Sequence, residues 1–550
     1  MRKYPLNPVA YYTRFRDMIE DLGEKYGDKP AISWFSRKQE ETVVSYHQLC
    51  EDVKYLQEAF IEMGLAGKHL AIVGENCYEW LLVYFAACYC GSTAVCVDIE
   101  QSDETIQYML ATADTDAVFL SPAYADVCSA YAGTKIPQFL LYGKKENYRL
   151  VRHLIDDGAK IWLDGNANKS VDATVTPDHI ASIVFTSGTT SNAKPVMLSQ
   201  QAILTNASDA LANVKIGART FTSLPFYHTY GLTCSVLSML IPGSHLHING
   251  NLKTVMRDLQ LSKANTLLTV PLMLEMIHNR IWQSAEESGK DEDLKKLFKI
   301  TRLLRSIGIR KPGKVLEAIR EKSFGSIDLI ICGGAHMSAE IMDQFQCMGV
   351  TVLQGYGITE CGPLVSVNRN EANKLDSVGL VTANCEVKLD NGEILVRGKN
   401  LMTGYYNHPE LTEEAMRDGW FCTGDLGEID KDGFLYITGR KKNLIVFKNG
   451  KKLSPEKLEE KIKQIPIVQD VLVYGASNGL SSDDVQVAAS VYPRADQIEG
   501  MTSYEILEYL QKEINAINDD LPMYQQIQMI NIRQQAFSKT ALQKIKRHLV

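Results

Sequence analysis

The sequence has no excess of positive charge, no disulfide-type cysteine spacing and no repeated or low-complexity segment. Lys and Arg number 58 against 66 Asp and Glu, which gives a net charge of −8 over 550 residues. A mildly acidic chain lacks the basic footprint of a nucleic-acid-binding protein, so we expect no nucleic acid among its partners. The twelve cysteines include no C-x-x-C pair, and several stand in apolar runs, where a reduced cysteine acts as a small hydrophobe. The sequence therefore predicts a cytoplasmic protein.

Membrane-directing signals are also scarce. The first fifteen residues, MRKYPLNPVAYYTRF, include basic residues but no apolar core of the kind found in secretory signals. One uncharged run, Trp80 to Val97, approaches the length of a membrane span. Its interior Gly91-Ser92-Thr93 indicates instead a break between a buried helix and a buried strand. We therefore expect no transmembrane segment.

What is present is a chain too long for a single hydrophobic core. Hydrophobic residues make up 45% and charged residues 23%, which is ordinary for a globular protein. Up to about residue 440, short apolar runs at 69–74, 93–98 and 116–121 alternate with helical patterns. This alternation is typical of parallel sheets covered by helices. The sequence thus predicts an α/β fold, with a large N-terminal domain over residues 1–440.

The pattern changes to hairpins between about residues 385 and 440. Asn391-Gly392 and Asp432-Gly433 each separate two alternating runs. Both dipeptides suit a type I′ turn, because both of its central residues need φ > 0. We therefore expect a small antiparallel, barrel-like part at the end of the large domain.

A second domain is expected after a basic connector that follows Arg440. Ser454-Pro455-Glu456 has the features of a helix start, with a hydroxyl N-cap, proline at the first position and an acid in the first turn. Strand patterns at 468–475 and 485–493 and a helix from about Tyr504 follow. The sequence predicts a small α+β domain over residues 441–550, with a hinge near Lys442.

Four segments carry polar groups suited to a small polyanion, and the first follows the apolar run at 183–185. Residues 186–191 form a hydroxyl-rich turn, and Lys194 comes shortly after. Hydroxyl and backbone N–H groups donate to phosphate oxygens, Gly188 permits close approach and the lysine adds a positive charge. The segment is not a Walker A loop, because G-x-x-x-x-G-K-[ST] is absent. On composition alone, a surface turn rich in Ser and Thr is the commoner explanation.

The second segment, VLQGYGITECGP at 352–363, places Tyr356 between two glycines and continues to Thr359 and Glu360. A strand end that turns on glycines can present an aromatic face to a base and a carboxylate to Mg²⁺. The alternative is a tight loop with a buried tyrosine.

The third segment places Asp425 on a Thr-Gly-Asp-Leu turn, where the carboxylate can accept two ribose hydroxyls or cap the next strand. The fourth, AFSKTALQKIKRHL at 536–549, is by itself typical of a solvated basic tail.

Taken together, these four segments resemble the adenylate-forming superfamily of acyl-CoA synthetases, luciferases and peptide-synthetase adenylation domains. The resemblance extends from about residue 10 to residue 549. It is most specific at 420–460, which is most similar to bacterial long-chain fatty acyl-CoA synthetases. It implies that ATP activates a carboxylic acid, a medium- or long-chain fatty acid, to an acyl-AMP that then passes to the thiol of coenzyme A. ATP, Mg²⁺ and coenzyme A are the implied cofactors and co-substrates, and the small domain is implied to be a mobile lid.

The resemblance also implies residue roles. Tyr356 matches the residue that stacks on adenine, Asp425 and Arg440 match those that hold the ribose, and Lys442 matches the hinge. The implied nucleotide-binding set is Thr186, Ser187, Gly188, Thr189, Thr190, Lys194, Gly333, Gly334, Ala335, Tyr356, Gly357, Asp425 and Arg440.

Three residues match catalytic positions and two match the acyl pocket. Thr359 matches a hydroxyl near the α-phosphate, Glu360 the Mg²⁺ ligand and Lys544 the lysine delivered for adenylation. His228 and Gly231, in LPFYHTYGL, match a segment near the acyl-tunnel mouth. A packed structural histidine is an equally good explanation of His228.

The sequence departs from the common family pattern next to both lysines. Pro195, which lacks an N–H and fixes φ, follows Lys194 where glycine is usual, and Gln543 precedes Lys544 where glycine is usual. Two alternative functions therefore stay open: an enzyme that loads the phosphopantetheine of an acyl carrier protein, and a nucleotide-binding pseudoenzyme. Acyl chain length, membrane association and oligomeric state, a homodimer included, are not readable from the sequence.

Overall fold

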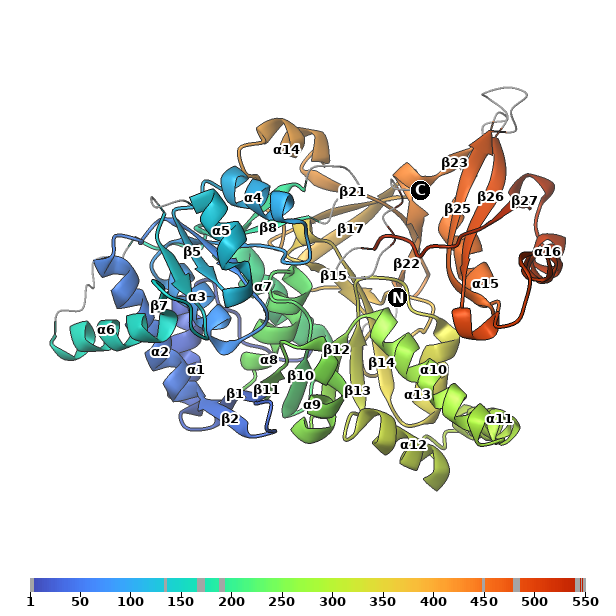
Figure 1. Cartoon of the computed structure of the whole chain (residues 1–550), viewed down its shortest axis with the longest axis horizontal. Helices are drawn as coiled ribbons and strands as arrows, with labels where there is room; N and C mark the ends of the chain where they lie inside the picture. The colour runs from blue at the N-terminus through green and yellow to red at the C-terminus, as the bar shows by residue number, and fades with distance from the viewer. Residues whose placement is uncertain are drawn as a thin grey trace. The chain divides into compact units, whose positions relative to one another are not determined.

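The computed structural model describes residues 4–132, 136–165, 174–186, 193–447, 451–477, 485–539, 545 and 547. The chain forms two compact units (Figure 1). The first unit comprises residues 1–386, 396–421 and 431–434, and the second comprises 387–395, 422–430 and 435–550. The chain passes from one unit to the other more than once within the hairpins of residues 385–440.

Two large sheets form the frame of the first unit. The strands of the eight-stranded sheet, in spatial order, are β19 (Gly404–Tyr405), β9 (Pro195–Ser199), β8 (Ile180–Phe185), β4 (Thr93–Cys96), β3 (His69–Val73), β5 (Ala117–Leu120), β6 (Gln138–Leu140) and β7 (Arg149–Leu150). Those of the nine-stranded sheet are β16 (Leu380–Val381), β15 (Leu364–Val367), β14 (Thr351–Gly357), β13 (Leu329–Cys332), β12 (Thr266–Thr269), β10 (Arg219–Thr222), β11 (His245–Ile248), β1 (Pro30–Phe35) and β2 (Glu41–Ser45).

The apolar runs predicted as strands are confirmed. β4, β3 and β5 are parallel neighbours that contain the runs at 93–98, 69–74 and 116–121. The helices between the strands of this unit are α1 (Phe15–Tyr26), α2 (Tyr46–Glu62), α3 (Tyr78–Tyr89), α4 (Asp103–Thr112), α5 (Ala125–Ala132), α6 (Val151–Leu163), α7 (Gln200–Asn213), α8 (Ser238–Leu240), α9 (Val255–Ser262), α10 (Pro271–Glu287), α11 (Asp291–Ser306), α12 (Lys314–Phe324), α13 (Ala339–Cys347) and α14 (Pro409–Ala415). The α/β fold class is thus confirmed.

The uncharged run at 80–97 is the buried helix and strand that the sequence indicated. Every residue of α3 except Glu79 is buried, and all four residues of β4 are buried as well. Trp80 meets Phe226 edge-on, with ring centroids 5.6 Å apart. Among the residues that the structure describes, no helix is both long and apolar enough to cross a bilayer.

The predicted hairpins form a five-stranded sheet of β17 (Cys385–Asp390), β18 (Glu393–Gly398), β21 (Trp420–Ile429), β20 (Met416–Arg417) and β22 (Leu435–Arg440). Asn391 and Gly392 both have positive φ, at 51° and 84°, as a type I′ turn requires. At the second hairpin only Gly433 has positive φ, so the expectation for Asp432 was wrong. The Asp432 carboxylate instead binds Lys374 Nζ at 2.9 Å.

The C-terminal part of the second unit is a three-stranded sheet flanked by helices. Its elements are β23 (Ile445–Val446), β24 (Lys452–Leu453), α15 (Pro455–Lys463), β25 (Val468–Ser477), β26 (Val485–Pro493), α16 (Ser503–Asp519) and β27 (Ile527–Ile532). α15 begins where the sequence predicted, although the Ser454 side chain makes no capping hydrogen bond. A capping box of Thr502 and Glu505 begins α16.

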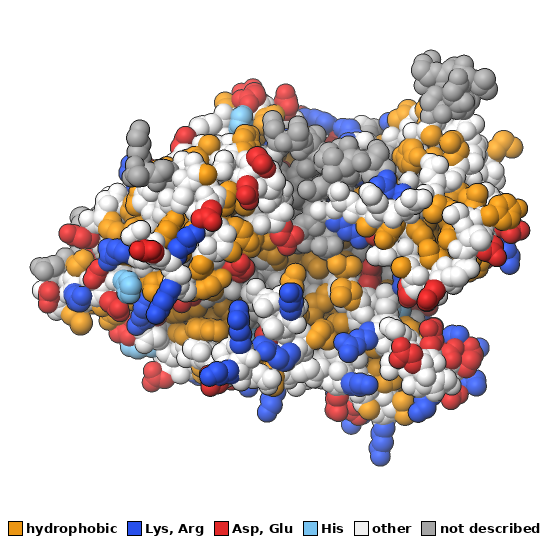
Figure 2. Space-filling view, in the orientation of Figure 1, with side chains coloured by type: hydrophobic (Ala, Val, Ile, Leu, Met, Phe, Trp, Pro, Cys, Tyr) orange, Lys and Arg blue, Asp and Glu red, His pale blue; other side chains and the backbone are white. Residues whose placement is uncertain are grey.

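The surface and the cysteines agree with the composition. Figure 2 shows basic and acidic side chains intermixed over this face of the molecule, as the small net charge suggests. The twelve cysteines all lie within the described residues and form no disulfide. Burial raises the pKa of the Cys128 thiol to about 12, so this thiol stays protonated at neutral pH.

One buried histidine couples the stability of the nine-stranded sheet to pH. His247 of β11 is 3% exposed, its Nδ1 lies 3.0 Å from Ser33 Oγ, and its ring stacks on Phe221. Burial lowers the pKa of His247 to about 4, against about 6.5 in an unfolded chain. Between these values the unfolded chain binds a proton that the folded chain does not, so stability falls as the pH drops from about 6.5 to about 4.

We predict that His247→Gln makes thermal stability less sensitive to acid. The wild-type chain loses up to about 1.4 kcal/mol per pH unit through this residue within that window. The Tm difference between pH 7.5 and pH 5 is therefore expected to shrink in the variant, as measured by differential scanning fluorimetry. His47→Gln, on the exposed side of α2, is the control and should leave the difference unchanged. If Tm falls equally between pH 7.5 and pH 5 in wild type and in His247→Gln, the acid sensitivity does not come from His247.

Candidate functional site

Three neighbouring parallel strands bring two of the predicted segments to one sheet edge. β12, β13 and β14 pair in parallel, and Cys332 at the end of β13 lies opposite Gln354 of β14. Gly333 and Gly334 follow β13, while β14 continues past this register to Tyr356. Ligands of open α/β sheets commonly bind outside the carboxyl ends of such strands. The predicted glycine segment and the predicted adenine-stacking tyrosine therefore lie at the same edge.

The segment that contains His228 joins this edge through Tyr230. Residues Tyr230–Leu237 form a π-helix, which the sequence did not reveal and which often marks functional sites. The Tyr230 hydroxyl donates to the carbonyl oxygens of Thr269, at 3.2 Å, and Ile331, at 3.0 Å, at the ends of β12 and β13. A Cβ on Gly333 would lie only 3.2 Å from the Tyr230 ring. The two predicted pocket segments thus pack against each other.

His228 lies two residues before this helix, and Gly231 is its second residue. His228 is 8% exposed, and its ring packs against Tyr227 at 4.8 Å between centroids. A Cβ on Gly231 would fall 1.9 Å from the carbonyl oxygen of Pro225, so only glycine fits there. Burial raises the pKa of Tyr230, which therefore contributes a neutral hydroxyl.

The two ends of the predicted phosphate loop are closed by the backbone. Thr186 N donates to Lys194 O at 3.0 Å, and Phe185 lies opposite Pro195 at the start of the β8–β9 pair. Pro195 is the first residue of β9, a strand position that tolerates proline. Its carbonyl oxygen accepts a hydrogen bond from Tyr406 N at 2.8 Å. Pro195, which differs from the common family pattern, therefore fits this position without loss of the β8–β9 pairing. Ser187, Gly188, Thr189 and Thr190 lie outside the described residues.

Tyr405 links Lys194 to Glu360. The Lys194 Nζ atom lies 4.9 Å from the centre of the Tyr405 ring, a cation–π contact. The Tyr405 hydroxyl donates to Glu360 Oε1 at 2.9 Å. Burial, together with the neighbouring Glu360 carboxylate, raises the pKa of Tyr405, which stays protonated and able to donate. One tyrosine thus holds the lysine of the predicted phosphate loop near the predicted metal ligand.

The loop that contains Glu360 is held by buried amides. Asn206 and Asn400 are fully buried, and the Nδ2 atom of each donates to the carbonyl oxygens of Cys361 and Leu364 at 2.8–3.3 Å. Asn206 Oδ1 also accepts from Leu364 N at 2.9 Å. The two buried amides thereby hold the backbone of the loop, and with it the backbone position of Glu360.

The glycine after Tyr356 and the turn around Thr359 complete this loop. A Cβ on Gly357 would lie 2.3 Å from the carbonyl oxygen of Pro363, so glycine allows β14 and β15 to approach closely. Thr359 begins a short 3₁₀ turn, and Thr359 O accepts from Gly362 N at 3.1 Å. Met402 N donates to Glu360 O at 2.8 Å. Thr359 and Glu360 are therefore adjacent on a well-ordered turn.

Asp425 and Arg440 form an ion pair within the second unit. Asp425 of β21 lies opposite Arg440 of β22, and Arg440 Nε lies 2.9 Å from Asp425 Oδ1. Asp425 N donates to Thr423 Oγ1 at 3.0 Å. The sequence expectation of a turn was wrong, because Asp425 lies within the uninterrupted strand β21 and pairs there with Arg440 of β22. The two predicted ribose-binding residues nevertheless lie side by side.

The C-terminal tail is anchored on both sides of the predicted catalytic lysine. Lys539 Nζ binds Asp470 at 2.9 Å, and Arg547 forms an ion pair with Glu459. Burial raises the pKa of Glu459 to about 7, although the Arg547 guanidinium opposes this shift. Lys544 itself, and Gln543 before it, lie outside the described residues.

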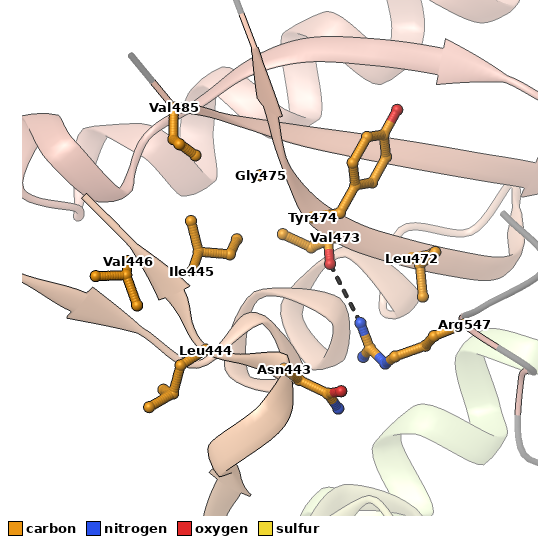
Figure 3. A pocket seen from close by; sticks show the side chains of 10 residues that line it. All are labelled: Asn443, Leu444, Ile445, Val446, Leu472, Val473, Tyr474, Gly475, Val485 and Arg547. Atoms are coloured by element: carbon orange, nitrogen blue, oxygen red, sulfur yellow. Dashed lines mark hydrogen bonds between the residues drawn. The ribbon is translucent and has the colours of Figure 1, made fainter. Parts of the chain in front are cut away.

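A hollow of about 360 Å³ lies where the predicted hinge segment, β25 and the tail meet (Figure 3). Residues 443–446 and 472–475 line it together with Val485 and Arg547, and Arg547 Nη1 donates to Val473 O at 3.2 Å. Lys442 belongs to the short 3₁₀ turn Lys441–Asn443 immediately before this hollow. The predicted hinge segment is thus continuous in sequence with residues 443–446, which line the hollow together with Arg547 of the tail.

Sequence reasoning missed Tyr405, Tyr230 and the two buried amides. Each is an ordinary residue far along the chain from its partner: Tyr405 is 45 positions from Glu360, and Asn206 is 158 from Leu364. Only the pairing of β9 with β19, which sets Tyr405 opposite Val196, brings the tyrosine to Lys194. No local motif marks such contacts.

We predict that Asn206→Ala destabilises the first unit by about 2–3 kcal/mol. The substitution leaves Leu364 N and a carbonyl oxygen buried without this partner, and each lost buried contact costs about 1–3 kcal/mol. The measurement is urea unfolding followed by intrinsic fluorescence. Asn279→Ala, at an exposed position of α10, should change the midpoint little. Equal midpoints for Asn206→Ala and wild type would contradict the role of the amide.

Most of the chain matches known protein families. Residues 19–406 match the family described as AMP-binding enzyme, and residues 442–550 match the AMP-binding enzyme C-terminal domain. Long chain acyl-CoA synthetase 1 of Arabidopsis thaliana is 29% identical, over 84% of this chain and 77% of its own length. Long-chain-fatty-acid–CoA ligase FadD15 of Mycobacterium tuberculosis is 27% identical, over 79% of this chain and 75% of its own.

Solved structures share the fold. The anthranilate CoA ligase AuaEII in complex with anthranoyl-AMP superposes with a TM-score of 0.78 at 16% identity, covering 99% of this chain and 97% of that one. A Mycobacterium tuberculosis fatty acyl CoA synthetase gives a TM-score of 0.66 at 20% identity, with 98% and 97% covered. The family match spans well over half of the chain, and the chain belongs to the AMP-binding enzyme family.

Proposed function

We propose that the chain is an AMP-forming acid–thiol ligase that activates a medium- or long-chain fatty acid with ATP and transfers the acyl group to coenzyme A. In the first step a carboxylate oxygen bonds to the α-phosphorus of ATP, the bond to the β-phosphate breaks, and pyrophosphate leaves. In the second step the thiol sulfur bonds to the acyl carbon, the carbon–oxygen bond to AMP breaks, and the thiol proton passes to solvent. The acid–thiol ligases named among the relatives support this reaction.

The observation that carries the proposal is the contact of Lys194, Tyr405 and Glu360. This contact joins Lys194, which comes shortly after the hydroxyl-rich turn at 186–191, to the carboxylate of Glu360, which lies in the loop after Tyr356. A carboxylate nucleophile needs no base at neutral pH. The barrier instead comes from bringing two anions together and from charge that develops on the phosphate, which fixed donors and cations stabilise.

The donors of this site fit a Mg²⁺ ion held together with a triphosphate. Within the described part of the chain, no group of three or more His, Cys, Asp or Glu side chains could hold a metal by itself. Mg²⁺ in nucleotide sites typically uses one or two carboxylates plus substrate phosphates, and Glu360 supplies one such carboxylate. When bound, the ion would neutralise triphosphate charge. Thr186, Ser187, Thr189 and Thr190 are proposed to donate to the β- and γ-phosphates.

We assign the remaining nucleotide contacts in the same way. Tyr356 is proposed to stack on adenine beside Gly333, Gly334 and Ala335, and Thr359 to donate near the α-phosphate. Asp425 and Arg440, already paired, are proposed to hold the ribose. His228 and Gly231 are assigned to the acyl pocket.

Residues 441–550 are proposed to be a lid domain that turns about Lys442. In one orientation Lys544 would bridge the acyl carboxylate and the α-phosphate; in the other it would leave and admit the thiol. The ion pairs of Lys539 and Arg547 support this role, because they fasten the tail to the same unit on either side of Lys544.

Acceptor, assembly and location complete the proposal. Coenzyme A is the proposed acyl acceptor, and the phosphopantetheine of a carrier protein is the alternative. An assay that supplies each thiol and measures acyl transfer to it distinguishes the two. The homodimer stays a prediction. We propose a cytoplasmic location, because a dozen cysteines without a disulfide are usual in reducing compartments.

We predict that Lys544→Ala lowers acid-dependent exchange of pyrophosphate into ATP by a few hundred-fold. Loss of one such charge-stabilising contact typically costs about 3–4 kcal/mol. The assay uses a panel of acids from acetate to palmitate on the full chain. Lys512→Ala, an exposed lysine of α16, is the matched control and should retain full exchange. If no acid supports exchange above the level of Lys544→Ala, the enzyme proposal fails and the pseudoenzyme alternative replaces it.

We further predict that Tyr405→Phe raises the Mg²⁺ concentration needed for half-maximal exchange by roughly fivefold to tenfold. The substitution keeps the ring against Lys194 but removes one hydrogen bond to Glu360, a contact worth about 1 kcal/mol or slightly more. Tyr406→Phe, which removes a hydroxyl bound to Asp114 instead, is the matched control. An unchanged Mg²⁺ dependence in Tyr405→Phe would separate Glu360 from the metal site.

A further inference from the structure

Helix α11 has two apolar faces, and only one of them packs on the protein. Leu294, Phe298 and Thr301 are buried against the core of the first unit. A second stripe follows the spacing i, i+3, i+4, i+7, which places its members on one side of a helix. It consists of Ile300, Leu303, Leu304 and Ile307, with exposed fractions of 55%, 67%, 36% and 69%.

Exposed apolar residues continue along the sequence beyond the helix. Ile309, in the connection to α12, is 48% exposed, and Val315, in the first turn of α12, is 56% exposed. Single exposed apolar residues are normal, but a continuous series is typical of a binding surface. Residues 294–316, apart from the buried Leu294, Phe298, Thr301 and Leu316, are named here the α11–α12 surface.

The α11–α12 surface is also strongly basic. Residues 294–316 contain no Asp or Glu, although Asp291, Glu292 and Asp293 precede them in the first turn of α11. The eight basic residues of this surface are Lys295, Lys296, Lys299, Arg302, Arg305, Arg310, Lys311 and Lys314. A basic amphipathic helix of this kind is typical of membrane-surface contacts.

The basic residues divide into three groups. Arg302 and Arg305 bind Asp343 of α13 and so fasten α11 to the unit. Lys295 and Lys296 pair with acids in the first turn of the same helix. The remaining four, which have no acidic partner among the residues described, are exposed: Lys299, Arg310, Lys311 and Lys314. Figure 2 shows basic side chains projecting from the edge of the molecule where Figure 1 places α12.

We propose that the α11–α12 surface binds the face of a bilayer that contains anionic phospholipid. The outward stripe of Ile300, Leu303 and Ile307 would enter the boundary between headgroups and acyl chains. Basic side chains beside it would remain at the anionic headgroups, with their aliphatic stems along the apolar surface. An anionic leaflet is opposite in charge to this surface, whereas two copies that met through the same surface would bring like charges together; this favours a lipid over a symmetric dimer. The binding is independent of the proposed reaction.

The test is co-sedimentation of the full chain with sucrose-loaded vesicles. We expect binding to vesicles of equal parts phosphatidylglycerol and phosphatidylcholine, weaker by roughly tenfold or more with phosphatidylcholine alone, and reduced by salt. Leu303→Ser/Ile307→Ser and Lys299→Gln/Lys311→Gln should each lower the affinity by roughly tenfold. Leu252→Ser/Lys253→Gln removes an exposed leucine and lysine elsewhere on the unit and should bind as wild type.

Two outcomes would overturn the proposal, provided that the variants unfold at the wild-type temperature. One is a lack of binding to the anionic vesicles, or variants that bind as tightly as wild type. The other is self-association of the full chain, seen by analytical ultracentrifugation, that these variants abolish without any vesicle binding. The surface would then be an interface between two copies.

Discussion

Two fully buried amides, those of Asn206 and Asn400, hold the loop that carries Glu360 where strands of the two large sheets approach each other. β14 and β15, on either side of the loop, belong to one sheet, and Tyr405 of β19, which binds Glu360, belongs to the other. A carboxylate, a lysine and an aromatic ring are therefore positioned by the packing of the whole unit. The packing of this junction holds these three groups close together, although they are far apart in the chain.

A neutral tyrosine stands between the two charged groups of this junction. Burial keeps the Tyr405 hydroxyl protonated, and it donates its proton to the Glu360 carboxylate. Lys194 is the cation next to Tyr405. Such an arrangement suits a reaction whose main demand is the stabilisation of phosphate charge, since it fixes a cation in place and needs no proton transfer between protein groups.

The strands, the buried α3–β4 pair and the start of α15 followed from the sequence because each rests on local pattern: apolar runs, glycine breaks and proline at a helix start. Asp425 was placed wrongly because Gly424, whose φ is 69°, suggests a turn although it lies within strand β21. Ser454 occupies the cap position, yet its hydroxyl does not make the expected bond. Local sequence predicts where an element begins better than which hydrogen bonds its side chains make.

The long-range contacts could not be predicted in this way. Tyr405 has the appearance of a core strand residue, and its role depends on the pairing of β19 with β9. Lys194 and Glu360 were found by motif, but the tyrosine between them belongs to none. The same holds for the α11–α12 surface, because sequence periodicity alone does not say which of two apolar faces packs inward.

The π-helix at Tyr230–Leu237 has a consequence for the evolution of the pocket. A π-type turn accommodates one residue more than an α-type turn, so a single deletion within it would restore ordinary winding and rotate the neighbouring side chains by about 100°. Tyr230 would then leave the ends of β12 and β13, although no strand need move. Where this segment lines the proposed acyl pocket, one inserted or lost codon therefore reshapes the pocket wall and leaves the surrounding scaffold intact.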